Sequence, residues 1–138
     1  MYILDEDYLQ IEVKGNKLIY YSEIDIIPTE IQFKKVTEAL KNYFAAIEKK
    51  NKNFYQIFKI DNATIASIYN YSTVISWICE FFRTQHPIFD KYLKCSVIII
   101  DNLFIKTSIN MVLSAYPTAR PVHFITDLNE LDGLLNSY

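Results

Sequence analysis

Glycine is scarce in this chain, with only Gly15 and Gly133 among 138 residues. Loops that cradle phosphate groups need glycine, because it takes positive φ easily and lets the backbone approach a ligand closely. Neither the G-x-G-x-x-G pattern of dinucleotide-binding folds nor the G-x-x-x-x-G-K-[ST] pattern of P-loop proteins is present. The sequence therefore excludes both of these nucleotide sites.

Arginine and cysteine are scarce as well. Arg83 and Arg120 are the only arginines, and the formal net charge is −2. The one cationic cluster, Lys49–Lys52, fits a solvated loop after a helix, so we expect no nucleic-acid partner. Cys79 and Cys95 stand apart in apolar segments. This predicts two buried free thiols and a reducing, cytoplasmic location.

Long apolar runs are also missing. None approaches the ~18 residues that a membrane span requires, and the acidic start Met1–Asp7 does not resemble a secretory signal. At 138 residues the chain is predicted to form one domain, residues 1–138,. A domain of this length buries enough surface to fold without a disulfide or a metal.

Aromatic residues are abundant, at 15% of the chain, with 11 Tyr and 9 Phe. One explanation is a genome biased toward AT-rich codons, because Ile, Asn, Lys and Tyr are all frequent here. The other is an interaction surface, since amphipathic aromatic side chains are enriched at interface cores.

The order of predicted elements is β-β-α-β-α-β-α-β-α. Leu9, Ile11 and Val13 alternate with polar residues, and Gly15-Asn16 fits a type II′ turn between two antiparallel strands,. The predicted elements are strands Tyr8–Lys14 and Lys17–Glu23, a helix from Thr29 to Lys49–Lys52, strand Phe54–Ile60, a helix from Ser72 or Thr73 to His86-Pro87, strand Cys95–Asn102, helix Leu103–Tyr116, strand Pro121–Ile125 and helix Asp127–Leu135. The fold class is therefore α/β, with a mixed sheet of about five strands under four to five helices.

This order resembles the STAS fold of anti-sigma-factor antagonists and sulfate-transporter tails, and the related fold of lipid-carrying Sec14-like domains. The resemblance covers roughly residues 8–136,. It rests on the opening hairpin, on Tyr55–Asp61 leading to a helix near Ser72, on Val97–Ile100 before a helix, and on Pro121–Glu130. It implies a STAS-like domain that acts by binding.

The residues at the phosphorylation site of that family differ here. Antagonists of the phospho-switch type carry D-S-[ST]-G at the start of the second helix, where this chain has Tyr69-Asn70-Tyr71-Ser72. Ser72 and Thr73 are therefore candidates either for modification or for a plain helix N-cap.

Acidic and imidazole side chains give few candidates for chemistry. Asp61 and Asp101 follow two predicted strands, where they either form a paired acidic site or cap the next element,. His86 and His123 are the only histidines, and neither has a partner at metal-ligand spacing,. A Cys–His nucleophile pair would need Cys79 or Cys95 beside one of them in space. We predict no metal, no cofactor and no catalysis.

The leading hypothesis is a non-enzymatic domain that binds protein as a regulator, adaptor or assembly subunit, with a protein partner or a homo-oligomer. Its expected contact surface consists of Tyr20, Tyr21, Tyr69, Tyr71 and Phe82. The alternative is a Sec14-like carrier of a small apolar ligand such as a lipid, which needs an apolar pocket between helices and sheet.

Overall fold

A computed structural model describes residues 1–115 and 120–138, so the predicted helix end at Tyr116 lies outside the described residues. The strands are β1 (Tyr2–Asp5), β2 (Leu9–Lys14), β3 (Lys17–Ser22), β4 (Phe54–Ile60), β5 (Leu93–Ile100) and β6 (Val122–Ile125). The helices are α1 (Glu30–Lys50), α2 (Ile65–Asn70), α3 (Ser72–Thr84), α4 (His86–Tyr92), α5 (Leu103–Leu113), the 3₁₀ turn η1 (Leu128–Glu130) and α6 (Leu131–Leu135). The predicted α/β class is confirmed.

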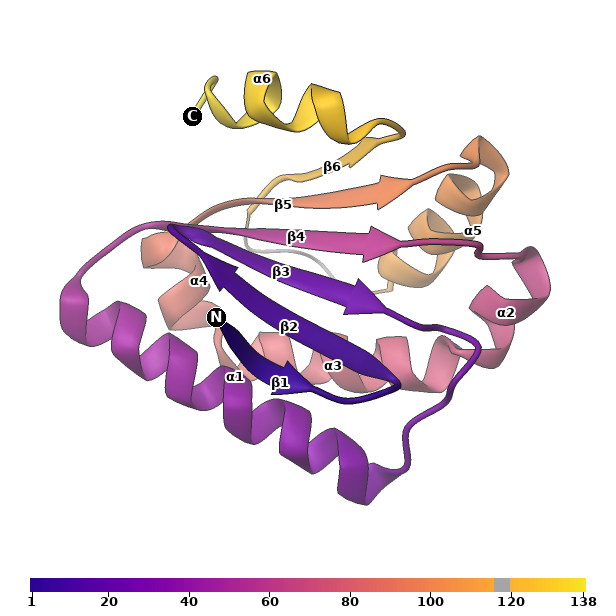
Figure 1. Cartoon of the computed structure of the whole chain (residues 1–138), viewed down its shortest axis with the longest axis horizontal. Coiled ribbons are helices and arrows are strands. Elements are labelled where there is room, and N and C mark those ends of the chain that lie inside the picture. Colours follow the sequence, from indigo (N-terminus) through magenta and orange to yellow (C-terminus); the bar gives the residue numbers. More distant parts are fainter. Residues whose placement is uncertain (116–119) are drawn as a thin grey trace.

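The six strands lie side by side in chain order, β1-β2-β3-β4-β5-β6 (Figure 1). The first three strands are antiparallel, and β3 to β6 are parallel. Helices α1 to α5 lie against one face of the sheet, whereas α6 covers the opposite face (Figure 1). Right-handed crossovers produce this one-sided arrangement when each new parallel strand is added at the same edge.

The opening hairpin forms as its sequence predicts. Lys14 pairs with Lys17, so the connection is a two-residue turn, and Gly15 has φ +59°. Asn16 is not among the residues with positive φ, as a type II′ turn requires,. The hairpin places Leu9, Ile11 and Leu18 on the helical face, where all three are buried.

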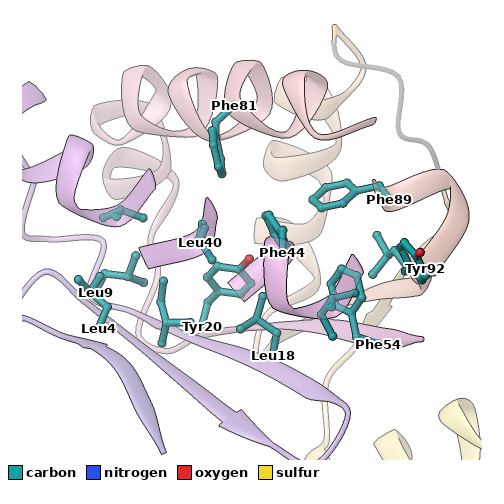
Figure 2. Close-up of a cluster of buried hydrophobic side chains, with 14 of the residues drawn as sticks. Leu4, Leu9, Leu18, Tyr20, Leu40, Phe44, Phe54, Phe81, Phe89 and Tyr92 are labelled. Atoms are coloured by element: carbon teal, nitrogen blue, oxygen red, sulfur yellow. The ribbon is translucent and has the colours of Figure 1, made fainter. Parts of the chain in front are cut away.

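The core on the helical face is rich in aromatic rings. Phe44 of α1 is fully buried, and its ring lies 5.2 Å from that of Phe89 and 5.8 Å from that of Phe54, between centroids. Figure 2 shows Phe81 and Phe89 pointing toward Phe44 from α3 and α4. Much of the aromatic surplus therefore lies inside the domain, where such ring contacts add to the stability that burial provides.

The opposite face has a smaller core. Ile57, Cys95 and Val97 of β4 and β5 are buried there beneath Leu131 and Leu135 of α6. Since β5 is buried on both faces, its continuous apolar run matches the prediction of a central parallel strand.

Three features of the chain differ from the sequence prediction. Tyr2–Asp5 forms an additional edge strand, and Ile65–Asn70 forms α2 in a stretch that gave no clear prediction. The break at His86-Pro87 is real, but a new helix starts there, because proline is tolerated in the first turn of a helix,.

Candidate functional site

An apolar cavity of about 190 Å³ lies between the helical face of the sheet and helices α2 to α5. Its floor comes from β3 to β6 and its walls come from the helices. The lining residues are Ser22, Ile24, Gln56, Phe58, Ile60, Ile68, Tyr71, Ile75, Ile78, Cys79, Phe82, Arg83, His86, Phe89, Leu93, Ser96, Ile98, Ile109, Leu113, Arg120 and Val122. Most of these side chains are apolar, as in ligand pockets generally.

A hydrogen-bonded polar group lies in the floor of this cavity. Gln56 of β4 is only 1% exposed. The hydroxyl of Tyr20 donates to Gln56 Oε1 over 2.5 Å, and Gln56 Nε2 lies 3.4 Å from Ser96 Oγ as a donor. The Gln56 amide has two N–H donors, so it has the capacity to donate to a ligand as well as to Ser96.

Three cationic or imidazole side chains also line the cavity. Arg83 lies in the last turn of α3, His86 begins α4, and Arg120 precedes β6. Arg83 pairs with Glu80 at 3.5 Å, and the Arg120 guanidinium donates a hydrogen bond to the backbone carbonyl of Asp90. Both arginines of the chain thus line the same cavity.

The thiol of Cys79 lines the cavity too. Burial, followed by the nearby Glu80 carboxylate, raises the pKa of Cys79 to about 11. A thiol with this pKa is almost fully protonated at neutral pH and is a poor nucleophile. The structure brings Cys79 and His86 to one cavity without activating the thiol.

Two of the five aromatic residues predicted to form a contact surface are buried instead. Tyr20 and Tyr71 are each 4% exposed, so neither is available at the surface. Phe82 is half-buried and packs its ring 5.1 Å from that of Phe89 and 6.5 Å from that of Tyr20. Phe82 faces the core, because the helical layer closes over this side of the sheet.

The other two predicted surface aromatics do reach solvent. Tyr69 on α2 is 57% exposed. Tyr21 is half-buried on the opposite sheet face, where its hydroxyl donates to Glu12 Oε1 over 2.8 Å. Of the five aromatic side chains predicted to form the contact surface, only Tyr69 is broadly exposed, and Tyr21 is partly exposed.

Ser72 and Thr73 lie in the first turn of α3, directly after α2. Their predicted role as a helix N-cap is wrong, since Tyr71 occupies the cap position and makes no side-chain capping bond. The side-chain caps of this region lie earlier, where Thr64 and Ser67 bond reciprocally at the start of α2. Thr73 is exposed and Ser72 is half-buried.

The acidic candidates at the strand ends are both exposed. Asp61 pairs with Lys59 at 3.9 Å and does not cap α2. Asn102, rather than Asp101, caps α5 by accepting a hydrogen bond from the backbone N–H of Phe104. Among the described residues, no three His, Cys, Asp or Glu side chains are placed to hold a metal ion.

A second polar cluster lies on the α6 side of the sheet. The ring nitrogen Nε2 of His123 is hydrogen-bonded to the hydroxyl of Tyr138. Tyr138 also bonds Cys95, whose pKa is raised by burial and lowered by this bond. Cys95 is fully buried. Because its thiol is inaccessible, this cluster fixes the C-terminal segment and offers no nucleophile.

Sequence reasoning missed most of the cavity. One signal for the cavity was present in the sequence, because Gln56 and Ser96 are polar residues at inward positions of two apolar strands. The rarity of arginine was a second signal for Arg83 and Arg120.

Comparison with known proteins gave no match among protein-family models, curated proteins or solved structures. Within residues 1–115 and 120–138, no helix is both long enough and apolar enough to cross a membrane.

Proposed function

We propose that this protein binds a small, largely apolar ligand without chemically transforming it. The observation that supports this is the cavity of about 190 Å³ between the sheet and α2 to α5. Apolar side chains form most of its wall, and a few polar groups converge on it, which is the usual composition of a ligand site.

The apolar lining supports the same proposal. Side chains that face the cavity have no protein atoms against them on that side, so they lack the van der Waals contacts of a packed core,. An apolar occupant would restore these contacts and remove the lining from water.

Native mass spectrometry of the purified protein tests the proposal directly. We expect a co-purifying small molecule, or binding of added short apolar compounds with a rise in melting temperature. Ile75→Trp, on the cavity wall, should abolish this rise, whereas Ile19→Trp on the opposite sheet face should retain it. A bare mass together with no stabilisation by any apolar compound would refute the proposal.

We also propose a STAS-like domain of the STAS and Sec14-like superfamily. The segments that carry the resemblance support it. They form the hairpin β2–β3, β4 followed by the additional short helix α2 and then by α3 starting at Ser72, β5 followed by α5, and β6 followed by a short helical segment with Asp127 as its cap. The free cysteines Cys79 and Cys95, which lie on opposite sides of the sheet, fit the proposed cytoplasmic location,.

A second candidate function is protein binding, as a regulator, adaptor or assembly subunit. It is favoured by exposed apolar side chains on the neighbouring helices α2 and α5. Ile65 and Tyr69 contribute from α2, and Phe104 and Met111 contribute from α5. Phe104 is 76% exposed, which is unusual for a phenylalanine without a partner,. Size-exclusion chromatography with light scattering tests this: Phe104→Glu should disrupt an oligomer or a captured complex, and a monomer that captures no partner would refute it.

A further inference from the structure

The polar side chains of the cavity gather at one end of it. Gln56 and Ser96 are register partners in β4 and β5. The backbone N–H of Ser96 donates to the carbonyl of Pro121 over 3.0 Å, which places Arg120 beside this level of the sheet. Arg120 in turn bonds to Asp90 in α4, the helix that begins with His86. Ser96 is the fourth residue of β5 and Arg120 lies just before β6, so these groups lie in the half of the sheet where β5 and β6 begin.

The other end of the cavity is mostly apolar. It is lined by Ile24, just after β3, and by Ile60, the last residue of β4. Ile68 of α2 and Ile109 of α5 close it from the helical side, and both are at most 4% exposed. Ser22, the last residue of β3 and the register partner of Ile60, adds one hydroxyl at this end. An elongated ligand would therefore meet cationic groups at the opposite end only.

The charge of the lining has a single sign. The chain has 16 acidic and 14 basic residues, of which only two are arginines. Both arginines line the cavity, and no Asp or Glu occurs among its described lining residues. Arginine presents a planar set of N–H donors that matches the oxygens of a carboxylate or a phosphate. The lining is thus complementary to an anion.

The volume limits the length of the ligand. A cavity of about 150 Å³ in another protein holds one benzene molecule. A cavity of about 190 Å³ therefore holds roughly six to eight carbon atoms. It is too small for a diacyl lipid or for the whole of a long fatty acid.

We infer that the ligand is a short single-chain amphiphile with an oxyanion head, and this rests on the ligand-binding function proposed above. The head lies at the end formed by Arg83, His86 and Arg120, near Gln56 and Ser96. The apolar body, of about six to eight carbons, extends toward Ile60 and Ile109. Carboxylate and phosphate heads share this chemistry.

Calorimetric titration with matched ligands tests the inference. Octanoate and monooctyl phosphate carry the two oxyanion heads, and octan-1-ol carries the same chain without charge. We expect at least one of the anions to bind tenfold or more tightly than octan-1-ol, and the stronger anion identifies the head. In the series from hexanoate to dodecanoate, affinity should rise about fourfold per carbon up to about eight carbons and then level off.

Arginine variants test where the head binds. Arg83→Gln and Arg120→Gln should each weaken binding of the preferred anion by about tenfold or more. Neither substitution should change the affinity for octan-1-ol. Unchanged octan-1-ol binding also shows that the cavity of the variant is intact. Lys34→Gln removes a positive charge from the exposed side of α1, outside the cavity, and should leave both affinities unchanged.

The outcomes separate this inference from the function on which it rests. Equal affinity for both anions and octan-1-ol would overturn the oxyanion head but keep apolar-ligand binding. A rise in affinity that continues through dodecanoate would overturn the size limit. If octan-1-ol and the anions all fail to bind, both the inference and the proposed function are wrong.

Discussion

The hydrogen bond between Tyr20 and Gln56 provides the sharpest test of the described core. The two groups are 4% and 1% exposed, and their oxygens lie 2.5 Å apart. Tyr20→Phe leaves Gln56 Oε1 without this donor, and Gln56→Leu leaves the buried Tyr20 hydroxyl without its acceptor. A buried polar group that loses its partner costs about 1–3 kcal/mol. For a domain of this size, each variant should lower the melting temperature by roughly 4–12 °C.

The double variant Tyr20→Phe/Gln56→Leu removes both partners at once. Replacing both members of a buried hydrogen-bonded pair by apolar groups is nearly neutral for stability. The double variant should therefore lose about 1 kcal/mol or more less free energy of unfolding than the sum of the losses of the two single variants. Urea unfolding of the four proteins gives this coupling free energy. The control is Tyr21→Phe, which removes a hydroxyl from the opposite face, where water can replace it beside Glu12.

One result would contradict this role of the Tyr20–Gln56 hydrogen bond. If Tyr20→Phe costs no more than Tyr21→Phe, and the effects of the two single substitutions simply add, then water from the cavity already satisfies Gln56. In that case the cavity floor is wet, and the amide has less to offer a ligand.

Three further predictions concern reactivity, pH and packing. Because the pKa of Cys79 is raised to about 11, its labelling by a maleimide should rise about tenfold per pH unit between pH 7 and 9, and Cys79→Ser should abolish labelling because Cys95 is buried. Burial raises the pKa of Tyr71 to about 12 in the folded protein, whereas a tyrosine in the unfolded chain has a pKa of about 10. The unfolded chain therefore loses this proton at lower pH, and the free energy of unfolding should fall between pH 10 and 12. Tyr71→Phe should reduce that fall, measured by urea unfolding at each pH. Phe44→Ala should cost about 3–5 kcal/mol, seen as a melting temperature lower by roughly 10–20 °C; a loss below 1 kcal/mol would contradict the described core.

Local signals in the sequence predicted most of the fold. Thr29 and Gln32 form the expected capping box at α1, and Asp127 caps the final helical segment. These elements depend on residues only a few positions apart. By contrast, β1 is four residues long and exists by pairing with β2 at the sheet edge. The start of α2 also carries a local signal, since Thr64 and Ser67 form a reciprocal capping pair there.

The candidate site was harder to predict, because it depends on which face of the sheet the helices cover. Alternation places Tyr20 and Tyr21 on opposite faces, but it does not say which face is closed. Five helices cover the Tyr20 side, so that tyrosine is buried, while Tyr21 reaches solvent. The cavity itself is a gap in the packing between helices and sheet, and no periodicity in the chain reports such a gap.

The placement of charge along the sheet gives the cavity a direction. Ligands of open α/β sheets usually bind outside the carboxyl ends of the strands, where this chain has the exposed carboxylates of Asp61 and Asp101,. Arg83 and Arg120 instead lie at the end where β5 and β6 begin. An anion is repelled at the first end and attracted at the second. Because all four of these charged groups are exposed, both effects should weaken as the salt concentration rises,. The charges of the chain thus favour one orientation of an anionic amphiphile, with its apolar body toward the carboxyl ends of the strands.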